Sequence, residues 1–254
     1  MDPEISVVVP LHNEGPNVLP LVRRIFDAFQ NEHRPIELIL VDDASTDETH
    51  ARLLDAAADP RVRSLHHPRR SGQSAALWTG FKASRGVVIL TLDGDLQNDP
   101  ADLPRLLAGL KDCDLVCGVR VKRMDNGLRR ISSAVARLAR KWVLNSEFRD
   151  TGCNLRAFKS CVIETIPPFN GFHRFMPVLA RGGGAVVKEM PVAHHPRTAG
   201  KANYGLWNRL GHGIRDLIMV RWYLKRQLKI LPPAEKHCVP RETPAKYIDK
   251  EPGR

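Results

Sequence analysis

The stretch Val87-Val-Ile-Leu-Thr-Leu-Asp-Gly-Asp-Leu-Gln-Asn-Asp-Pro100 constrains this chain most, because an apolar run ends abruptly in acidic residues. A β-branched and aliphatic run bounded by turn residues is typical of a buried strand in a parallel sheet. Asp93, Asp95 and Gln97 follow it, and open α/β sheets bind ligands beyond the carboxyl ends of their strands. Oxygen ligands at this spacing suit Mg²⁺ or Mn²⁺. The alternative is an acidic turn that merely begins the next helix.

Strand-like and helix-like segments alternate along most of the chain. Short β-branched runs are followed by segments whose apolar residues recur at helical spacing. Such alternation predicts an α/β fold with a mixed, mainly parallel sheet and helices on both faces. The predicted strands are 5–10, 36–41, 62–65, 87–92, 114–118 and 185–192, and the segment 150–158 is predicted to be a turn that runs into a further strand.

Two earlier strands also end in polar residues. His12 and Glu14 follow the first strand, and Asp42 and Asp43 follow the second. Right-handed crossovers place the ends of parallel strands at one edge of the sheet. The three polar strand ends are therefore predicted to form one site, although each acidic pair could instead begin an ordinary turn.

The charge balance predicts an anionic partner. The 254 residues carry a formal net charge of +11, which suits nucleic acid, phosphorylated small molecules or acidic lipid. Five scattered cysteines form no Cys-x-x-Cys pair, so a zinc site is not predicted and a reducing compartment is the simpler expectation. The N-terminus has no apolar signal-peptide region, and no run approaches the roughly 20 apolar residues that span a bilayer.

Carboxylates opposite arginines suggest a specific ligand chemistry. A cation held by carboxylates neutralises a pyrophosphate, and guanidinium groups bind phosphate oxygens through charge-assisted hydrogen bonds. Arginines are abundant after the fifth predicted strand, with Arg120, Arg129 and Arg130 as the candidates. The excess of arginines suggests two phosphorylated ligands, one of them a nucleoside diphosphate.

Several motifs, in order, resemble those of family 2 glycosyltransferases with the GT-A fold. They are Val9-Pro-Leu-His-Asn-Glu14, Val41-Asp-Asp-Ala-Ser-Thr-Asp47, Ser71-Gly-Gln-Ser-Ala-Ala-Leu77 and Asp93-Gly-Asp-Leu-Gln-Asn-Asp-Pro100. Later motifs look like the polyprenyl-phosphate branch, which includes dolichol-phosphate mannose synthase. These are Asp150-Thr-Gly-Cys-Asn-Leu-Arg-Ala-Phe158, His173-Arg-Phe-Met-Pro177 and His194-His-Pro-Arg-Thr-Ala-Gly-Lys-Ala-Asn-Tyr-Gly205. The resemblance covers roughly residues 5 to 230.

The resemblance implies an inverting transfer from a GDP- or UDP-linked sugar to a polyprenyl phosphate, with Mg²⁺ or Mn²⁺. The implied nucleotide and donor contacts are Pro10, His12, Glu14, Asp42, Asp43 and Gly72, and the implied metal ligands are Asp93, Asp95 and Gln97. The implied phosphate contacts are Arg120, Arg129, Arg130, Arg174, Arg197 and Lys201, with Asp150 as a basic or orienting group. Within this set, Asp95, Asp150, Arg120 and Arg130 are the candidate catalytic residues.

The chain departs from the family pattern at several positions. Ala44 and Asn154 stand where glycine is usual, and Ala202 and Asn203 precede Tyr204 where Lys and Ser are typical. The last change leaves a soluble saccharide or protein acceptor open beside the lipid phosphate. A non-catalytic protein that binds anions or nucleic acid is a remote alternative, because no nucleic-acid-binding fold signature is present.

The last third of the chain predicts contact with a membrane surface. We expect a transferase domain over 1–205, an amphipathic helix over 206–231 and a disordered tail over 232–254. Leu217, Ile218 and Trp222 share an apolar face of that helix, on which Arg221 and Lys225 also fall. Apolar and basic residues together suit a membrane interface, so we expect a cytoplasmic protein bound peripherally to a membrane or to a membrane subunit.

Overall fold

The computed structural model describes residues 2–121, 138, 140–196 and 206–227, with the backbone alone for 206–212 and 214. Within them the chain forms a seven-stranded sheet of order β3-β2-β1-β4-β6-β5-β7. The strands are β1 (Ile5–Leu11), β2 (Ile36–Asp42), β3 (Val62–His66), β4 (Val88–Thr91), β5 (Leu115–Arg120), β6 (Arg156–Lys159) and β7 (Val187–Val192). Only β6 among them runs antiparallel to its neighbours. The prediction of a mixed, mainly parallel α/β sheet is confirmed.

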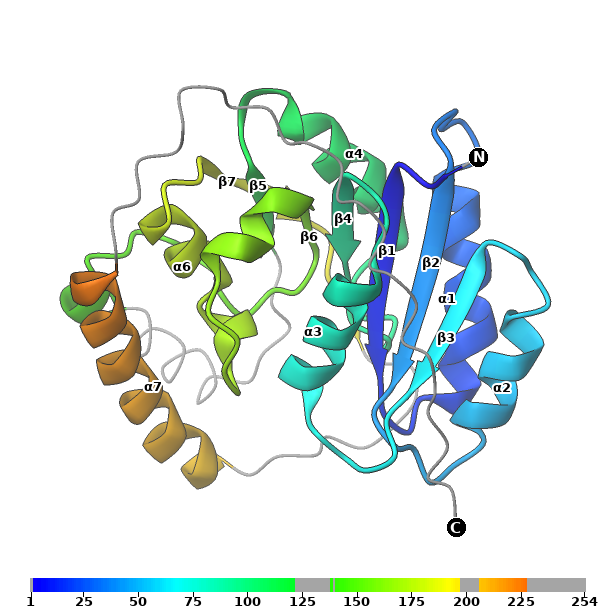
Figure 1. Cartoon of the computed structure of the whole chain (residues 1–254), viewed down its shortest axis with the longest axis horizontal. Helices are drawn as coiled ribbons and strands as arrows, with labels where there is room; N and C mark the ends of the chain where they lie inside the picture. The colour runs from blue at the N-terminus through cyan, green and yellow to red at the C-terminus, as the bar shows by residue number, and fades with distance from the viewer. Residues whose placement is uncertain (1, 122–137, 139, 197–205, 228–254) are drawn as a thin grey trace, which may run out of the picture.

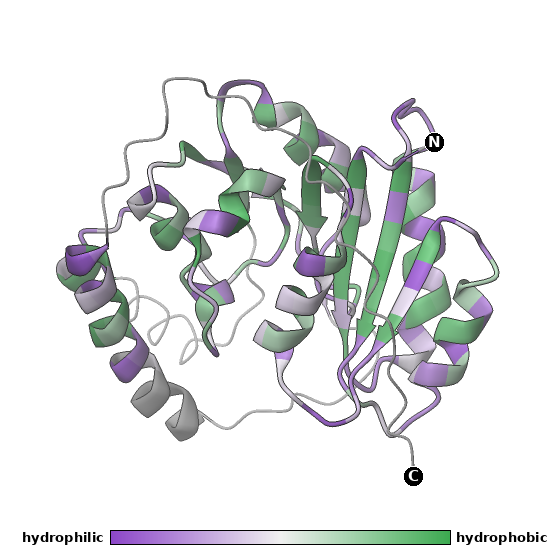
Figure 2. Cartoon of the chain, in the orientation of Figure 1, coloured by the Kyte–Doolittle hydropathy of each residue, from purple (hydrophilic) through white to green (hydrophobic). Residues whose placement is uncertain are grey.

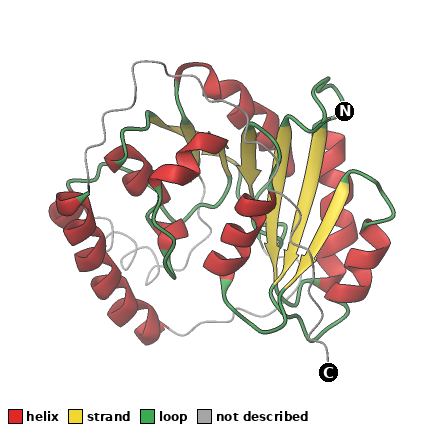
Figure 3. Cartoon of the chain, in the orientation of Figure 1, coloured by secondary structure: helices red, strands yellow, loops and turns green. Residues whose placement is uncertain are grey.

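Helices cover both faces of the sheet (Figures 1 and 3). One face packs against α1 (Gly15–Ala28), α2 (Thr49–Ala56) and α4 (Leu103–Ala108). The other packs against α3 (Gln73–Ala83), α6 (Met176–Gly182) and α7 (Leu206–Arg226). Short 3-10 turns connect them: η1 (Pro100–Asp102), η2 (Gly109–Asp112), η3 (Ser160–Thr165) and η4 (Phe172–Arg174).

The alternation of side chains along β1 explains the two layers. Val7 and Val9 belong to the core beneath α1, whereas Val8 between them belongs to the core beneath α3. Both faces of β1 are thus buried, and the central strands β1, β2 and β4 are mainly apolar (Figure 2). This buried sheet is the rigid frame that fixes the positions of its strand ends.

Helix α7 lies at the margin of the molecule, beside α6 (Figure 1). Its predicted apolar face is divided, because Leu217 is buried but Ile218 and Trp222 are 61% and 59% exposed. In the described part of the chain, no helix is long and apolar enough to cross a membrane. Most of the basic stretch after β5, the basic loop after β7 and the predicted tail lie outside the described residues.

Candidate active site

The ends of β1, β2 and β4 lie at one edge of the sheet. β1 pairs in parallel with both β2 and β4, with Leu11 opposite Asp42 and Val8 opposite Thr91. The polar residues after these strands therefore lie side by side, which is the arrangement that the sequence predicted for a shared site. Pro10 is buried within β1, one residue before it ends.

Each of the three strand ends turns through a residue in the left-handed backbone region. Asn13 has a φ of 56°, Ala44 of 53° and Leu96 of 57°. This conformation costs an L-residue about 1–2 kcal/mol and persists where the surrounding structure enforces it. Ala44 stands where glycine is usual in the family pattern, and the backbone explains that preference.

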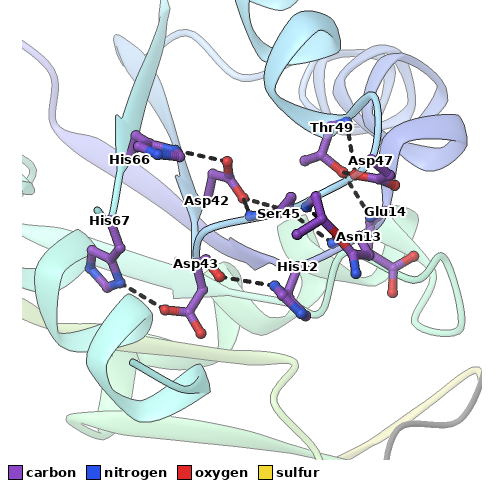
Figure 4. Close-up of polar contacts among 11 residues, drawn as sticks. His12, Asn13, Glu14, Asp42, Asp43, Ser45, Asp47, Thr49, His66 and His67 are labelled. Atoms are coloured by element: carbon purple, nitrogen blue, oxygen red, sulfur yellow. Dashed lines mark hydrogen bonds and ion pairs between the residues drawn. The ribbon is translucent and has the colours of Figure 1, made fainter. Parts of the chain in front are cut away.

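Protein donors saturate Asp43. Its Oδ1 lies 2.9 Å from His67 Nδ1 (Figure 4) and accepts from the Ser71 backbone N–H at 2.7 Å, while Oδ2 accepts from the Gly72 N–H at 2.7 Å. Burial favours the neutral carboxyl, but these hydrogen bonds outweigh it and hold the pKa of Asp43 below its ordinary value. Asp43 thus anchors the 71–72 loop, and Gly72 there has a φ of 91°.

The structure adds a second anchoring contact at this edge. His12 Nδ1 donates to the backbone carbonyl oxygen of Asp43 at 2.9 Å. Asp42 is fully buried, and its Oδ1 accepts from both the backbone N–H and the hydroxyl of Ser45. Its Oδ2 lies 2.9 Å from Nδ1 of His66. The orientation of the Asp42 carboxylate is therefore set before any ligand binds.

The loops that follow β1 and β2 are joined to each other. The Glu14 backbone N–H donates to Thr49 Oγ1 at 2.9 Å, and the Gly15 N–H donates to Asp47 Oδ2 at 3.2 Å (Figure 4). The Glu14 carboxylate accepts from Asn17 Nδ2 at 2.7 Å. Glu14 thus contributes to the shape of this edge through its backbone and through its side chain.

The carboxylates after β4 have a different environment. Asp93 Oδ1 accepts from Gln73 Nε2 at 2.8 Å and from Asn154 Nδ2 at 2.9 Å. Burial, and then the negative charge of Asp95, raise the pKa of Asp93 to about 6, against smaller opposing effects that include the charge of Arg120. A buried carboxylate beside a second negative charge forms a site where a cation is favoured.

The donors after β4 fit a hard divalent cation. Gly94 separates the two carboxylates, and a Cβ there would lie 2.3 Å from Leu11 Cδ2, so a larger residue would require the buried Leu11 side chain to shift. The Gln97 backbone N–H donates to Asp95 Oδ1 at 3.2 Å and so orients that carboxylate. Oxygen ligands of this kind suit Mg²⁺ or Mn²⁺, and Asp93, Asp95 and Gln97 are the residues that could hold it.

Two predicted catalytic residues form an ion pair with each other. Arg120 Nε and Nη2 donate to Asp150 Oδ2 at 2.7 Å and Oδ1 at 2.8 Å. Both side chains are largely buried. Burial opposes the charge of Arg120, but the hydrogen bonds that it donates to Asp150 raise the pKa of Arg120 above its ordinary value. A bidentate pair fixes the plane of the guanidinium, so Asp150 orients Arg120.

Of the remaining basic candidates, one contacts α7 and the others lie outside the described residues. Arg174 Nη2 donates to Asp216 Oδ2 of α7 at 2.6 Å and thereby ties η4 to that helix. Its predicted contact with phosphate remains a prediction. Arg129, Arg130, Arg197 and Lys201 lie outside the described residues.

Sequence reasoning did not select Gln73, Asn154, Arg156 or His173. Arg156 is 2% exposed, its Nη2 donates to the Thr151 carbonyl oxygen, and its Nε has no hydrogen-bond partner within the described residues. Burial, with the charge of Arg156 next, lowers the pKa of His173 to about 3, so this imidazole is neutral. Asn154 stands where glycine is usual in the family, and this difference was the sequence signal that could have indicated its contact with Asp93.

A model of one protein family matches more than half of this chain. The model of the family described as Glycosyl transferase family 2 matches residues 6–162. The chain belongs to this family. It is therefore a glycosyltransferase, as the motifs predicted, and the matched segment contains all three polar strand ends.

Curated relatives narrow the comparison. The chain is 36% identical over 229 residues to dodecaprenyl-phosphate galacturonate synthase of Rhizobium johnstonii, covering 87% of this chain and 68% of that protein. It is 37% identical over 204 residues to undecaprenyl-phosphate 4-deoxy-4-formamido-L-arabinose transferase of Pseudomonas aeruginosa, covering 79% and 60%. The chain thus spans about two thirds of the length of these relatives.

Solved structures share the fold at lower identity. The chain is similar to glucosyl-3-phosphoglycerate synthase from Mycobacterium tuberculosis, solved with Mn²⁺, UDP-glucose and phosphoglyceric acid. The TM-score is 0.64 at 20% identity, with 87% of this chain and 79% of that chain covered. This likeness confirms the expected GT-A type of fold.

Proposed function

We propose that this glycosyltransferase moves a sugar from a nucleotide sugar to the phosphate of a polyprenyl lipid, with inversion at the anomeric carbon. The observation that carries the proposal is the convergence of three polar strand ends, with Arg120 close enough for its positive charge to act on Asp93. The names of both relatives, which are polyprenyl-phosphate sugar transferases, support the acceptor class.

The β1 and β2 ends bind the nucleoside in this proposal. Asp42 faces the base or ribose, with Pro10, His12 and Glu14 around it, and Asp43 holds the 71–72 loop in place. That loop leads into α3, whose first residue, Gln73, contacts Asp93. The positive end of the α3 dipole is therefore directed toward the donor pyrophosphate.

Asp93, Asp95 and Gln97 hold Mg²⁺ or Mn²⁺ in this proposal. The bound cation would neutralise the charge that develops on the diphosphate leaving group. Gln73 and Asn154 keep Asp93 in one orientation through their hydrogen bonds to Oδ1.

The acceptor needs positioning more than deprotonation. A phosphate monoester is already anionic near neutral pH, so its oxygen attacks the anomeric carbon as the bond to the diphosphate breaks. Arg120, oriented by Asp150, is proposed to bind a reacting phosphate, because a fixed cation stabilises charge without reorganisation. Arg129, Arg130, Arg174, Arg197 and Lys201 are proposed as further phosphate contacts.

Helix α7 is proposed to lie against the membrane that carries the acceptor. Ile218 and Trp222 are exposed beside the exposed basic residues Arg221 and Lys225. Apolar side chains flanked by cations suit the interface of an anionic membrane. Peripheral binding at a cytoplasmic membrane face follows from this proposal.

Radiolabel transfer tests the function. The purified chain is incubated with Mg²⁺ or Mn²⁺, a panel of labelled UDP- and GDP-sugars, and undecaprenyl phosphate in detergent. Label in the organic phase, absent with Asp95→Ala, is expected. Label that stays in water-soluble products would contradict the lipid acceptor and favour a soluble one. Thermal shifts with UDP and GDP separate the two bases, because bound nucleotide stabilises the fold.

A further inference from the structure

Two histidines that the proposed function does not use lie beside Asp42. Asp42 is the last residue of β2, His66 is the last residue of β3, and the strand register places them opposite each other. His50 is the second residue of α2. One ligand atom from each of the three lies within 4.8 Å of the other two. Three different elements thus bring a carboxylate and two imidazoles together.

The carboxylate is oriented toward the histidines. Ser45 holds Asp42 Oδ1 through two hydrogen bonds, and Oδ2 lies 2.9 Å from His66 Nδ1 (Figure 4). An ion at the usual bond length of about 2.0–2.2 Å can contact both atoms after they move slightly apart from this hydrogen-bonding distance. Outer hydrogen bonds of the Ser45 type orient the ligands of metal sites.

The His50 ring completes the set. It stands edge-on to the His66 ring, with 5.1 Å between centroids. Both histidines are exposed, so the His50 ring can rotate toward an ion with little cost in packing. Two imidazoles with one carboxylate suit Zn²⁺ and related transition ions and disfavour Mg²⁺.

We propose that Asp42, His50 and His66 form a second metal site, specific for Zn²⁺ and similar ions and separate from the site after β4. On binding, the ion takes the place of the proton between His66 Nδ1 and Asp42 Oδ2, and the neutral imidazole then carries its proton on Nε2. This proposal rests on the proposed function in one respect: because Asp42 is assigned to the base or ribose, Zn²⁺ and the donor nucleotide exclude each other.

Calorimetric titration tests the site without any nucleotide. Metal-stripped protein is titrated with ZnCl₂ alone, and His50→Ala and His66→Ala are compared with His33→Ala, which removes an exposed histidine elsewhere. We expect one equivalent of Zn²⁺ in the wild type, with affinity at least about tenfold weaker in the two site variants and unchanged in His33→Ala. Circular dichroism checks that each variant is folded.

Two results would overturn the site. One is wild-type affinity in folded His50→Ala and His66→Ala, and the other is an equal loss of affinity in His33→Ala. A further titration measures UDP and GDP binding with and without Zn²⁺. Zn²⁺ should raise the apparent Kd of the nucleotide in the wild type but not in His50→Ala, and no such rise would overturn the competition. If neither nucleotide binds even with Mg²⁺, the proposed function fails while the zinc titration still decides the site.

Discussion

The acidic ends of β2 and β4 look alike in the sequence, but they differ in what neutralises them. Asp43 receives hydrogen bonds from three groups of the protein, and its pKa is lowered. Asp93 accepts hydrogen bonds from two side-chain amides and lies near the negative charge of Asp95. Burial and that charge raise the pKa of Asp93 to about 6. The first carboxylate is stabilised as an anion by the fold, and the second is destabilised as an anion by the fold.

This difference separates a structural role from a ligand-binding one. A carboxylate whose oxygens are occupied by backbone donors fixes a loop and has little capacity for a ligand. A pair of adjacent carboxylates left with excess negative charge gains most from a cation. Substitutions at the two strand ends should therefore have different effects on metal binding and on stability.

Asp95→Ala should abolish most sugar transfer. Removing a group that stabilises developing charge costs about 10²–10³-fold in rate, and loss of a metal ligand belongs at the upper end, about 10³-fold. Initial rates with labelled nucleotide sugar measure the loss, and Mn²⁺ titration measures the binding defect. Asp112→Asn is the control, because Asp112 is 81% exposed and lies in η2. Equal transfer rates in wild type and Asp95→Ala would remove the basis for the β4 cation.

Asp43→Asn should destabilise the fold. The amide keeps one acceptor oxygen, but its NH₂ group faces a backbone N–H that then has no acceptor. We therefore expect the free energy of unfolding to fall by about 2–3 kcal/mol. Because the folded-state pKa of Asp43 is lowered, its stabilisation is present above the unfolded pKa of about 3.9 and is lost as the pH falls through the folded value. Urea unfolding at pH 7 and in acid measures both. An unchanged stability with impaired nucleotide binding would instead place Asp43 against the ligand.

Asp93→Asn should stabilise the metal-free protein, whereas Asp43→Asn destabilises it. The folded-state pKa is raised to about 6, so between about pH 4 and 6 the folded state holds a proton that the unfolded state has lost, and stability falls as the pH rises. An amide still accepts from Gln73 and Asn154, and removes the charge. We expect a gain on the order of 2 kcal/mol at pH 7.5, which vanishes below about pH 4.

Thermal unfolding of the wild type and of Asp93→Asn is then measured with added Mn²⁺. Mn²⁺ should stabilise the wild type and leave Asp93→Asn unchanged, because only the wild type has the full ligand set. A metal-free Asp93→Asn that is less stable than the wild type would mean that protein donors already satisfy this carboxylate. The contrast between the two strand ends would then be wrong.

The sequence predicted the fold because the central strands β1, β2 and β4 are mainly apolar runs that alternate with segments of helical periodicity, and it predicted the shared edge because parallel strands end together. It did not distinguish Asp43 from Asp93, because their partners are remote: His67 and Ser71 are 24 and 28 residues beyond Asp43, and Asn154 is 61 residues beyond Asp93. Such contacts depend on how the elements pack, and no local pattern contains them.

The contacts of the arginines also join residues that are remote in the sequence, and no local pattern predicted them. Arg120 and Asp150 were each predicted as part of the site, but nothing in the sequence indicated that they pair with each other across 30 residues. Arg156 occupies a strand position that polarity alone would have assigned to the surface, yet it is 2% exposed. Its burial follows from the position of β6 between β4 and β5.

Asn154→Gly should weaken metal binding without a matching loss of stability. The change restores the residue usual in the family and removes one of the two amides that orient Asp93 Oδ1. Loss of an outer-shell contact of this kind costs about 10–100-fold in metal affinity, and we expect about tenfold. The same change removes the buried Asn154 Oδ1, which has no hydrogen-bond partner within the described residues, so the stability should change little. Mn²⁺ titration beside Gln73→Ala, which removes the other amide, is the measurement.

Ala44→Gly should give the smallest effect, a gain in stability. The left-handed backbone of Ala44 costs about 1–2 kcal/mol, and the greater chain entropy of unfolded glycine cancels about 0.5–1 kcal/mol of the relief, so a gain of roughly 0.5 kcal/mol remains. Ala51→Gly, on the exposed side of α2, is the matched control and should lose about 1 kcal/mol. A loss in Ala44→Gly would show that the β2 turn is held by its side-chain contacts more than by its backbone. The Asp43 network would then be less rigid than the contrast with β4 requires.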